Sequence, residues 1–162
     1  MDEAARAWHA GAGGWAGLTD INSHSIGIEL ANSGSQPFAE PQMAALETLL
    51  RGIMARWAIP AHRVIAHSDM APDRKGDPGE RFDWRRLALQ GLSVWPEEPG
   101  DPAQTLARSL DAIGYPHALD EARLTAFRLR FRPWATGPET EADRALADAV
   151  AQRFIRISAQ FV

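Results

Sequence analysis

The chain has 162 residues, of which 45% are hydrophobic and 23% are charged, a composition typical of a folded domain with room for one small companion. Seventeen basic and 21 acidic side chains give a net charge of -4, so the basic excess of a dedicated nucleic-acid-binding protein is absent. No apolar run approaches the ~18 residues of a membrane span, and the polar, acidic first residues carry no export signal. The chain lacks cysteine, so a bound metal would need histidine and carboxylate ligands.

Domain organisation is indicated by residues 95–102, WPEEPGDP, which combine three prolines, a glycine and three acidic residues. Such a composition interrupts both helices and strands. We therefore predict a first unit of residues 1–95, a linker of residues 96–102 and a second unit of residues 103–162.

The first unit mixes strand and helix patterns. Residues 25–30 (SIGIEL) alternate in the manner of a half-buried strand, which places Glu29 on the face opposite the isoleucines. Residues 41–59 carry apolar side chains at the spacing of one helix face, and residues 84–90 form a second helical pattern. Residues 63–66 (RVIA) are a short β-prone run. These patterns predict an α/β fold in which helices cover a sheet.

The second unit carries three helical patterns, at residues 103–113, 120–131 and 141–155. Each pattern has one apolar stripe, and the three stripes are expected to pack against one another. Because about 60 residues are few for an independent core, this unit is expected to lean on the first.

Candidate chemistry is concentrated between His67 and Asp77. His67 directly follows the predicted strand at residues 63–66, and a loop containing proline can fold Asp77 back beside it. An imidazole and a carboxylate are typical ligands of a catalytic zinc. Lys75, the sole lysine beside sixteen arginines, would add an ammonium that stabilises an oxyanion. Spacing alone also fits a solvated surface loop, which is the more common origin of such a pair.

Three motifs add a resemblance to a known family. The segments AWHAG (residues 7–11), NSHSIGIELAN (residues 22–32) and VIAHSDMAPDRKGDPGERFDW (residues 64–84) resemble the type 2 N-acetylmuramoyl-L-alanine amidases. These are zinc enzymes that cut the bond between muramic acid and the first L-alanine of peptidoglycan. The resemblance covers about the first 95 residues and implies a mixed central sheet flanked by helices.

The resemblance also implies roles for single residues. His67 and Asp77 match zinc ligands, and Lys75 matches the group that stabilises the tetrahedral oxyanion. Glu29, in SIGIE, matches the catalytic glutamate that orients or deprotonates the attacking water. Without the motif, Glu29 would be read as an outward-facing strand acid.

Substrate contacts are implied near the N-terminus, where His9 and the neighbouring Trp8 match the groove of the family; loop packing is the alternative for both. The second unit resembles the three-helix peptidoglycan-binding module of some of these amidases, so the expected partner is peptidoglycan or a muropeptide. A helical core explains its apolar positions equally well.

One family feature has no counterpart here. The third zinc ligand is a histidine on a strand well before the AWHAG motif, but only eight residues precede His9. Either the natural protein begins upstream of Met1 or the chain is a relative that has lost hydrolysis; His9 or a second copy could also supply the ligand. The sequence thus predicts a zinc-dependent amidase, with a muramyl-peptide-binding protein as the alternative. Envelope localisation is expected for the full-length protein, with the cytoplasm left open.

Overall fold

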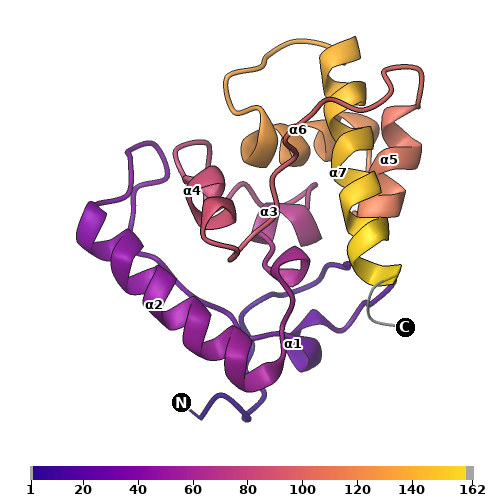
Figure 1. The fold of residues 1–162 in the computed structure, drawn as a ribbon. Coiled ribbons are helices and arrows are strands. Elements are labelled where there is room, and N and C mark those ends of the chain that lie inside the picture. The colour runs from indigo at the N-terminus through magenta and orange to yellow at the C-terminus, as the bar shows by residue number, and fades with distance from the viewer. Residues whose placement is uncertain (1, 160–162) are drawn as a thin grey trace.

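The computed structural model describes residues 2–159, with side chains up to residue 154. The α-helices are α1 (Ile21–His24), α2 (Glu40–Trp57), α3 (His67–Met70), α4 (Trp84–Leu89), α5 (Leu106–Ile113), α6 (Asp120–Phe131) and α7 (Glu141–Ala159), and a 3-10 turn, η1 (Ala61–Arg63), precedes α3. Helix α2 runs along one side of the molecule, and α5, α6 and α7 gather on the other side (Figure 1). Within the described residues, no helix has the length and apolar content needed to cross a membrane.

The predicted central sheet is wrong for the part of the chain that the structure describes. Residues 25–30 and 63–66 belong to no strand, and between residues 2 and 159 the only β-type pairing is an isolated bridge of Trp15 with Leu18. The backbone is nevertheless extended at Ser25 (φ -147°, ψ 159°) and at Val64 (φ -86°, ψ 104°). A period of two predicts extended backbone and one buried face, whereas a strand also needs a neighbour to complete its hydrogen-bond ladder.

Helix α2 confirms the helical pattern predicted at residues 41–59. Proline stands in its first turn, where no backbone N–H is required. Its last turn closes at Ala58, which adopts the left-handed conformation and donates its backbone N–H to the carbonyl of Met54. One face of α2 is buried, and its members are Met43, Leu46, Leu50 and Ile53. This face contributes to a smaller hydrophobic cluster with residues of α4 and the loops around it.

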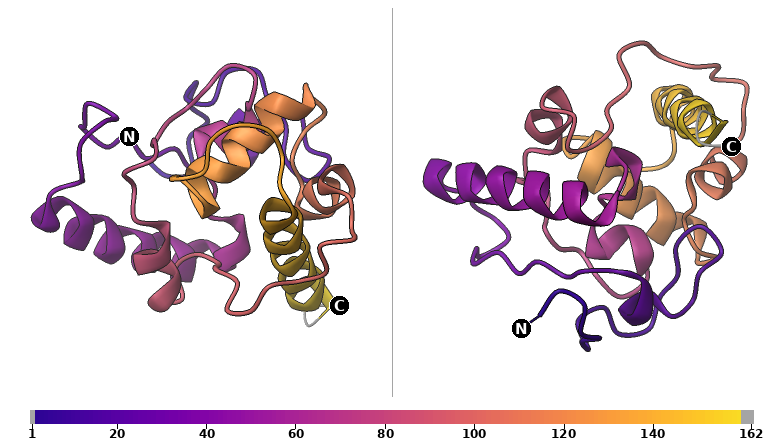
Figure 2. Two further views of the ribbon diagram at one scale, coloured as in Figure 1. Left: turned by 90° about the horizontal axis from the view of Figure 1, so that it is seen from above. Right: turned by 60° about the horizontal axis from the view of Figure 1, so that its bottom comes forward.

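The three predicted helices of the second unit are confirmed as α5, α6 and α7. Their stripes form the larger hydrophobic cluster, and α5 packs along α7 (Figure 2). That cluster also includes residues of the first unit, among them Trp15, Ile21 and Met70. The second unit therefore shares its core with the first, as its small size led us to expect, and the proposed division at residues 96–102 stays a prediction.

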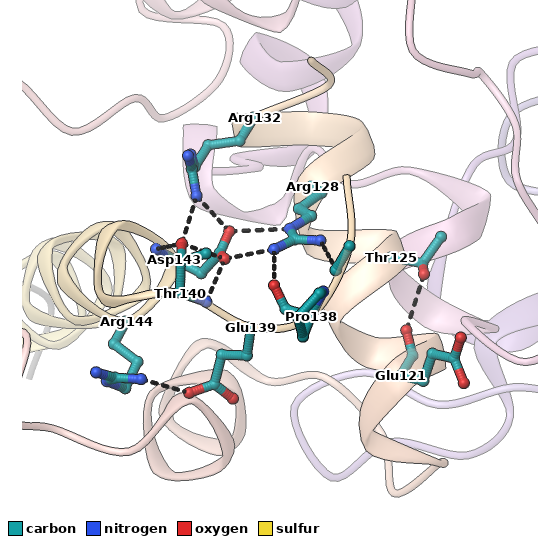
Figure 3. A network of polar contacts seen from close by, with 10 residues as sticks. Glu121, Thr125, Arg128, Arg132, Pro138, Glu139, Thr140, Asp143 and Arg144 are labelled. Atoms are coloured by element: carbon teal, nitrogen blue, oxygen red, sulfur yellow. Dashed lines mark hydrogen bonds and ion pairs between the residues drawn. The ribbon is translucent and has the colours of Figure 1, made fainter. Parts of the chain in front are cut away.

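A buried ion network fixes the start of α7 to α6 (Figure 3). Asp143 is 0% exposed and accepts hydrogen bonds from the guanidinium groups of Arg128 and Arg132. It also accepts from the backbone N–H and hydroxyl of Thr140. Burial alone would raise the pKa of Asp143, but these donors outweigh burial and hold that pKa well below its ordinary value. This carboxylate is thus charged and fully partnered at neutral pH.

Candidate active site

A large cavity of about 1480 Å³ opens between α2, the extended residues 25–30 and the segment that enters α3. Four of the six predicted site residues line this cavity, namely His9, Glu29, His67 and Asp77. The other two, Trp8 and Lys75, are not among the described residues that line it. The cavity thus gathers parts of all three sequence motifs.

Helix α3 presents His67 to the cavity. The predicted loop between His67 and Asp77 is not irregular throughout, because His67–Met70 form one helical turn. Asp69 closes this turn by accepting a hydrogen bond from the backbone N–H of Ala66 at 2.9 Å. The His67 side chain is only 19% exposed, so α3 sets its direction.

His67 and Asp77 meet, as the spacing predicted. Nδ1 of His67 lies 3.0 Å from Oδ2 of Asp77, and the backbone N–H of Ser68 donates to the Asp77 carbonyl at 3.1 Å. Nε2 of His67 lies 2.9 Å from the carbonyl oxygen of Ala10. A carbonyl only accepts hydrogen bonds, so we assign the proton of a neutral ring to Nε2. Nδ1 then points a lone pair at a carboxylate oxygen.

Two electron-rich atoms that face each other at 3.0 Å need a proton or a cation between them. A proton on Nδ1 would make this contact a hydrogen bond, whereas an imidazole nitrogen beside a carboxylate oxygen is also a donor set that suits a divalent metal, with the carbonyl of Ala10 as the partner that orients the ring. Among the side chains that the structure describes, those of residues 2–154, no group of three or more potential metal ligands occurs. The structure thus brings together the two residues predicted as zinc ligands.

Glu29 and Lys75 are placed differently. Glu29 is exposed on the cavity wall, on the extended segment whose isoleucines are half-buried. Lys75 is half-buried, and its backbone N–H donates to the carbonyl of Ala71. Its ammonium makes no hydrogen bond or ion pair with another described residue. The catalytic roles of both residues stay predictions.

His9 and Trp8 also differ from each other. His9 is half-buried, and its Nε2 lies 3.5 Å from the hydroxyl of Ser25. A Cβ added at Gly27 would lie 2.5 Å from Nδ1 of His9, so only glycine allows this close approach. Trp8 is 81% exposed, with the guanidinium of Arg6 over its ring at 4.5 Å. His9 therefore belongs to the cavity wall and Trp8 to the surface beside it.

Two residues that sequence reasoning does not single out hold this wall in place. Asn22 is buried in α1, and its side-chain oxygen accepts from the backbone N–H groups of His9 and Ala10, both at 2.9 Å. Arg74 donates to the carbonyl oxygens of Ala10 and Ala12. Neither residue has a spacing signal, because each binds the backbone of a segment remote in sequence.

Comparison with known proteins places these features in context. The sequence profile of the family described as N-acetylmuramoyl-L-alanine amidase matches residues 1–80. The chain is 38% identical over 177 residues to N-acetylmuramoyl-L-alanine amidase AmiD of Escherichia coli (strain K12), a match that covers 91% of this chain and 64% of AmiD. It is 44% identical over 82 residues to 1,6-anhydro-N-acetylmuramyl-L-alanine amidase AmpD of Haemophilus influenzae, covering 50% of this chain and 45% of AmpD. The chain thus spans less than two thirds of the length of either relative.

Solved structures agree over nearly the whole chain. The complex of E. coli AmiD with anhydro-N-acetylmuramic acid-L-Ala-D-gamma-Glu-L-Lys superposes with a TM-score of 0.86 at 36% identity, covering 94% of this chain and 71% of that one. The structure of AmpDh3 from Pseudomonas aeruginosa superposes with a TM-score of 0.83 at 29% identity, covering 96% and 72%. Both matches cover more than nine tenths of this chain and so are not confined to its first half.

Proposed function

The chain belongs to the N-acetylmuramoyl-L-alanine amidase family, and on that premise we propose that it hydrolyses the amide between N-acetylmuramic acid and L-alanine in peptidoglycan or its fragments. The observation that carries this proposal is the His67–Asp77 pair at the cavity, with its atoms 3.0 Å apart. A zinc-binding pair in a cavity of about 1480 Å³ is an arrangement suited to a bulky sugar-peptide substrate.

The proposed cofactor is Zn²⁺, held by Nδ1 of His67 and the carboxylate of Asp77. When bound, zinc supplies Lewis-acid polarisation of a carbonyl and activation of water at neutral pH. The chain's own contribution is to fix the two ligands. The Ala10 carbonyl holds the ring of His67 through Nε2, and the backbone N–H of Ser68 holds the segment of Asp77.

Proton transfer is assigned to Glu29 and charge stabilisation to Lys75. Glu29 presents its carboxylate from the cavity wall, where it accepts a proton from the attacking water and returns it to the leaving amine. Lys75 stands two residues before Asp77 on a long flexible stem, and its ammonium is proposed to turn toward the carbonyl oxygen as negative charge develops there.

The proposed substrate class is the muramyl peptide. AmiD was solved with an anhydro-muramyl peptide and AmpDh3 with an anhydromuramic pentapeptide. We propose that His9 on the cavity wall and Trp8 on the surface beside it contact such a ligand, with the exposed indole of Trp8 offering a flat apolar surface to the sugar. Location in the cell envelope stays a prediction.

The test is to incubate the purified chain and zinc with an anhydro-muramyl tripeptide and to follow free peptide by mass spectrometry. We expect release of the peptide, loss of activity with chelator, and loss in His67→Ala and Asp77→Asn. His117→Ala is the matched control, because His117 is exposed and does not line the cavity. Intact substrate after prolonged incubation with zinc-loaded protein would contradict the proposal.

A second candidate is binding of muramyl peptide without hydrolysis. It is favoured by the finding that the described residues supply two clustered ligands rather than the three of a typical catalytic zinc site. This candidate predicts that the chain sediments with insoluble peptidoglycan equally well with and without chelator. Absence of the chain from the pellet would remove it.

A further inference from the structure

The turn that carries His67 is anchored by a carboxylate that the proposed reaction does not use. Asp69 lies two residues after His67 in α3 and is 0% exposed. Besides the backbone N–H of Ala66, its carboxylate accepts a hydrogen bond from the hydroxyl of Tyr115 at 2.6 Å and one from Nη1 of Arg130 at 2.6 Å. Both side-chain donors come from the second unit.

Arg130 extends from α6 to the segment before α3. It is 3% exposed, and its Nη2 donates to the carbonyl of Val64 and to the hydroxyl of Ser93, both at 3.0 Å. Its guanidinium also stacks over the ring of Trp84 in α4 at 4.3 Å. Arg130 thus joins α6 to α3, α4 and the extended residues that lead to His67.

Helix α3 cannot orient itself. It has four residues, and a single helical turn is unstable in isolation because nucleation costs more than one hydrogen bond returns. Its direction must come from tertiary contacts, and α3 packs on α6 (Figure 1). The Asp69 carboxylate supplies the directional contacts across this boundary. The backbone bond from Ser68 to Asp77 then transmits the position of α3 to the second proposed ligand.

We propose that Arg130 and Tyr115 are positioning residues of the amidase site, which hold Asp69 and thereby fix α3 so that His67 meets Asp77. This inference rests on the proposed function for the role of the two ligands. It assigns the second unit a part in building the metal site, independent of any contact with the cell wall.

Charge and burial explain why this contact is directional. Apolar side chains of similar size can often replace a buried ion pair without loss of stability. Apolar contacts do not, however, fix how α3 is rotated about its axis. The hydrogen bonds of Arg130 do, because Nη1 and Nη2 of one planar guanidinium are directed at different partners, Asp69 and the Val64 carbonyl. Burial and then the negative charge of Asp69 raise the pKa of the Tyr115 hydroxyl well above its ordinary value, so Tyr115 remains a donor at neutral pH.

The chain offers a matched control on the same helix. Arg128, like Arg130, is a buried arginine of α6 paired to a fully buried aspartate at 2.6 Å, but its partner Asp143 lies in α7. We would compare Arg130→Met with Arg128→Met by zinc calorimetry and by amide exchange at Ser68, under conditions where circular dichroism shows both to be folded.

We expect Arg130→Met to weaken zinc binding about tenfold or more, as loss of a supporting contact around metal ligands does, and to speed exchange at Ser68. Arg128→Met should leave zinc affinity within about twofold, because its network does not touch α3. Equal zinc affinity and equal Ser68 exchange in the two variants would overturn the proposal.

Two milder variants decide the matter if Arg130→Met does not fold. Tyr115→Phe removes one hydroxyl. Arg130→Lys keeps the charge but loses the planar fork that reaches Asp69 through Nη1 and the Val64 carbonyl and Ser93 hydroxyl through Nη2. Faster Ser68 exchange in both, with unchanged exchange in α7, supports the proposal, and unchanged Ser68 exchange in both overturns it. If the wild-type chain binds no zinc, the proposed metal site is wrong, and Ser68 exchange alone then decides whether Arg130 positions α3.

Discussion

The helical side of the molecule and the cavity side satisfy their polar groups in different ways. On the helical side, α6 buries two charged pairs, Arg128 with Asp143 of α7 and Arg130 with Asp69 of α3. On the cavity side, no backbone N–H between residues 26 and 30 donates a hydrogen bond to another described residue. The segment that carries His67 is therefore held by buried hydrogen bonds and ion pairs. The extended segment that carries Glu29 is held mainly by side-chain packing.

The largest expected effect is a contrast in amide exchange. Amides of residues 26–30 should exchange close to their intrinsic rates, because they lack a protein acceptor in the described fold. Amides in the centre of α6 should be slower by about 10³-fold or more, since their opening approaches global unfolding. Amide hydrogen exchange measured by NMR tests this contrast. Comparable protection of residues 26–30 and of α6 would show that the two sides are held equally firmly.

Removal of Asp143 should produce the largest loss of stability. Asp143→Ala leaves the buried Arg128 and the partly buried Arg132 without their shared partner, and it should cost about 3–5 kcal/mol in the free energy of unfolding. Urea denaturation measures this loss. Glu139→Ala is the control, because its pair with Arg144 is exposed and should contribute less than about 1 kcal/mol. Similar losses in the two variants would contradict the special role of the buried network.

Acid should weaken the same network. Because donors hold the pKa of Asp143 below its ordinary value, its contribution is complete above the unfolded-state pKa of ~3.9 and declines as the pH falls from there. We expect about 2 kcal/mol of stability to be lost from this group by strong acid. Asp143→Asn should lack this component when unfolding is measured between neutral pH and acid. An equally steep decline in Asp143→Asn would show that other carboxyl groups are responsible.

The cavity side should respond less to loss of one acceptor. Asn22→Ala leaves the backbone N–H groups of His9 and Ala10 without their partner, which should cost about 1–2 kcal/mol. Asn32→Ala is the control, because its hydrogen bonds are exposed, and it should cost less than about 0.5 kcal/mol. Thermal unfolding distinguishes the two, and equal losses would argue against an anchoring role for Asn22.

Trp8→Ala should have the smallest effect on stability. At 81% exposure the indole contributes little to the core, so the change in the free energy of unfolding should stay under about 0.5 kcal/mol. Affinity for a muramyl peptide, measured by calorimetry, should nevertheless fall several-fold. A large loss of stability with unchanged affinity would instead make Trp8 a packing residue.

Local patterns were sufficient to locate most helices. Apolar residues at helical spacing predicted α2, α4, α5, α6 and α7, since one buried face is enough to select a helix. They failed for residues 25–30, because alternation records burial but not the presence of a neighbouring strand. They also missed α1 and α3, two helices of four residues each that rest on tertiary contacts.

The candidate site was predictable only where residues lie close in sequence. His67 and Asp77 come from one motif, and their meeting follows from a turn that folds the loop back. Asn22, Asp69 and Arg130 were missed as supports because each acts on a segment that only the fold brings near. Arg130 lies 61 residues from Asp69, and no spacing rule links two positions so far apart.

The ion pair between Arg130 and Asp69 has a consequence for protein engineering. Residues 103–162 supply Arg130, the cation that pairs with the buried carboxylate of Asp69 in the first unit. The helical unit therefore cannot simply be exchanged for another domain. A cut at residues 96–102 would remove Tyr115 and Arg130, both side-chain donors to that carboxylate, so a trimmed chain would lose the contacts that orient α3. A chimera that joins α5, α6 and α7 to another protein would need an acidic residue of that protein at the position of Asp69, so that Arg130 keeps a partner.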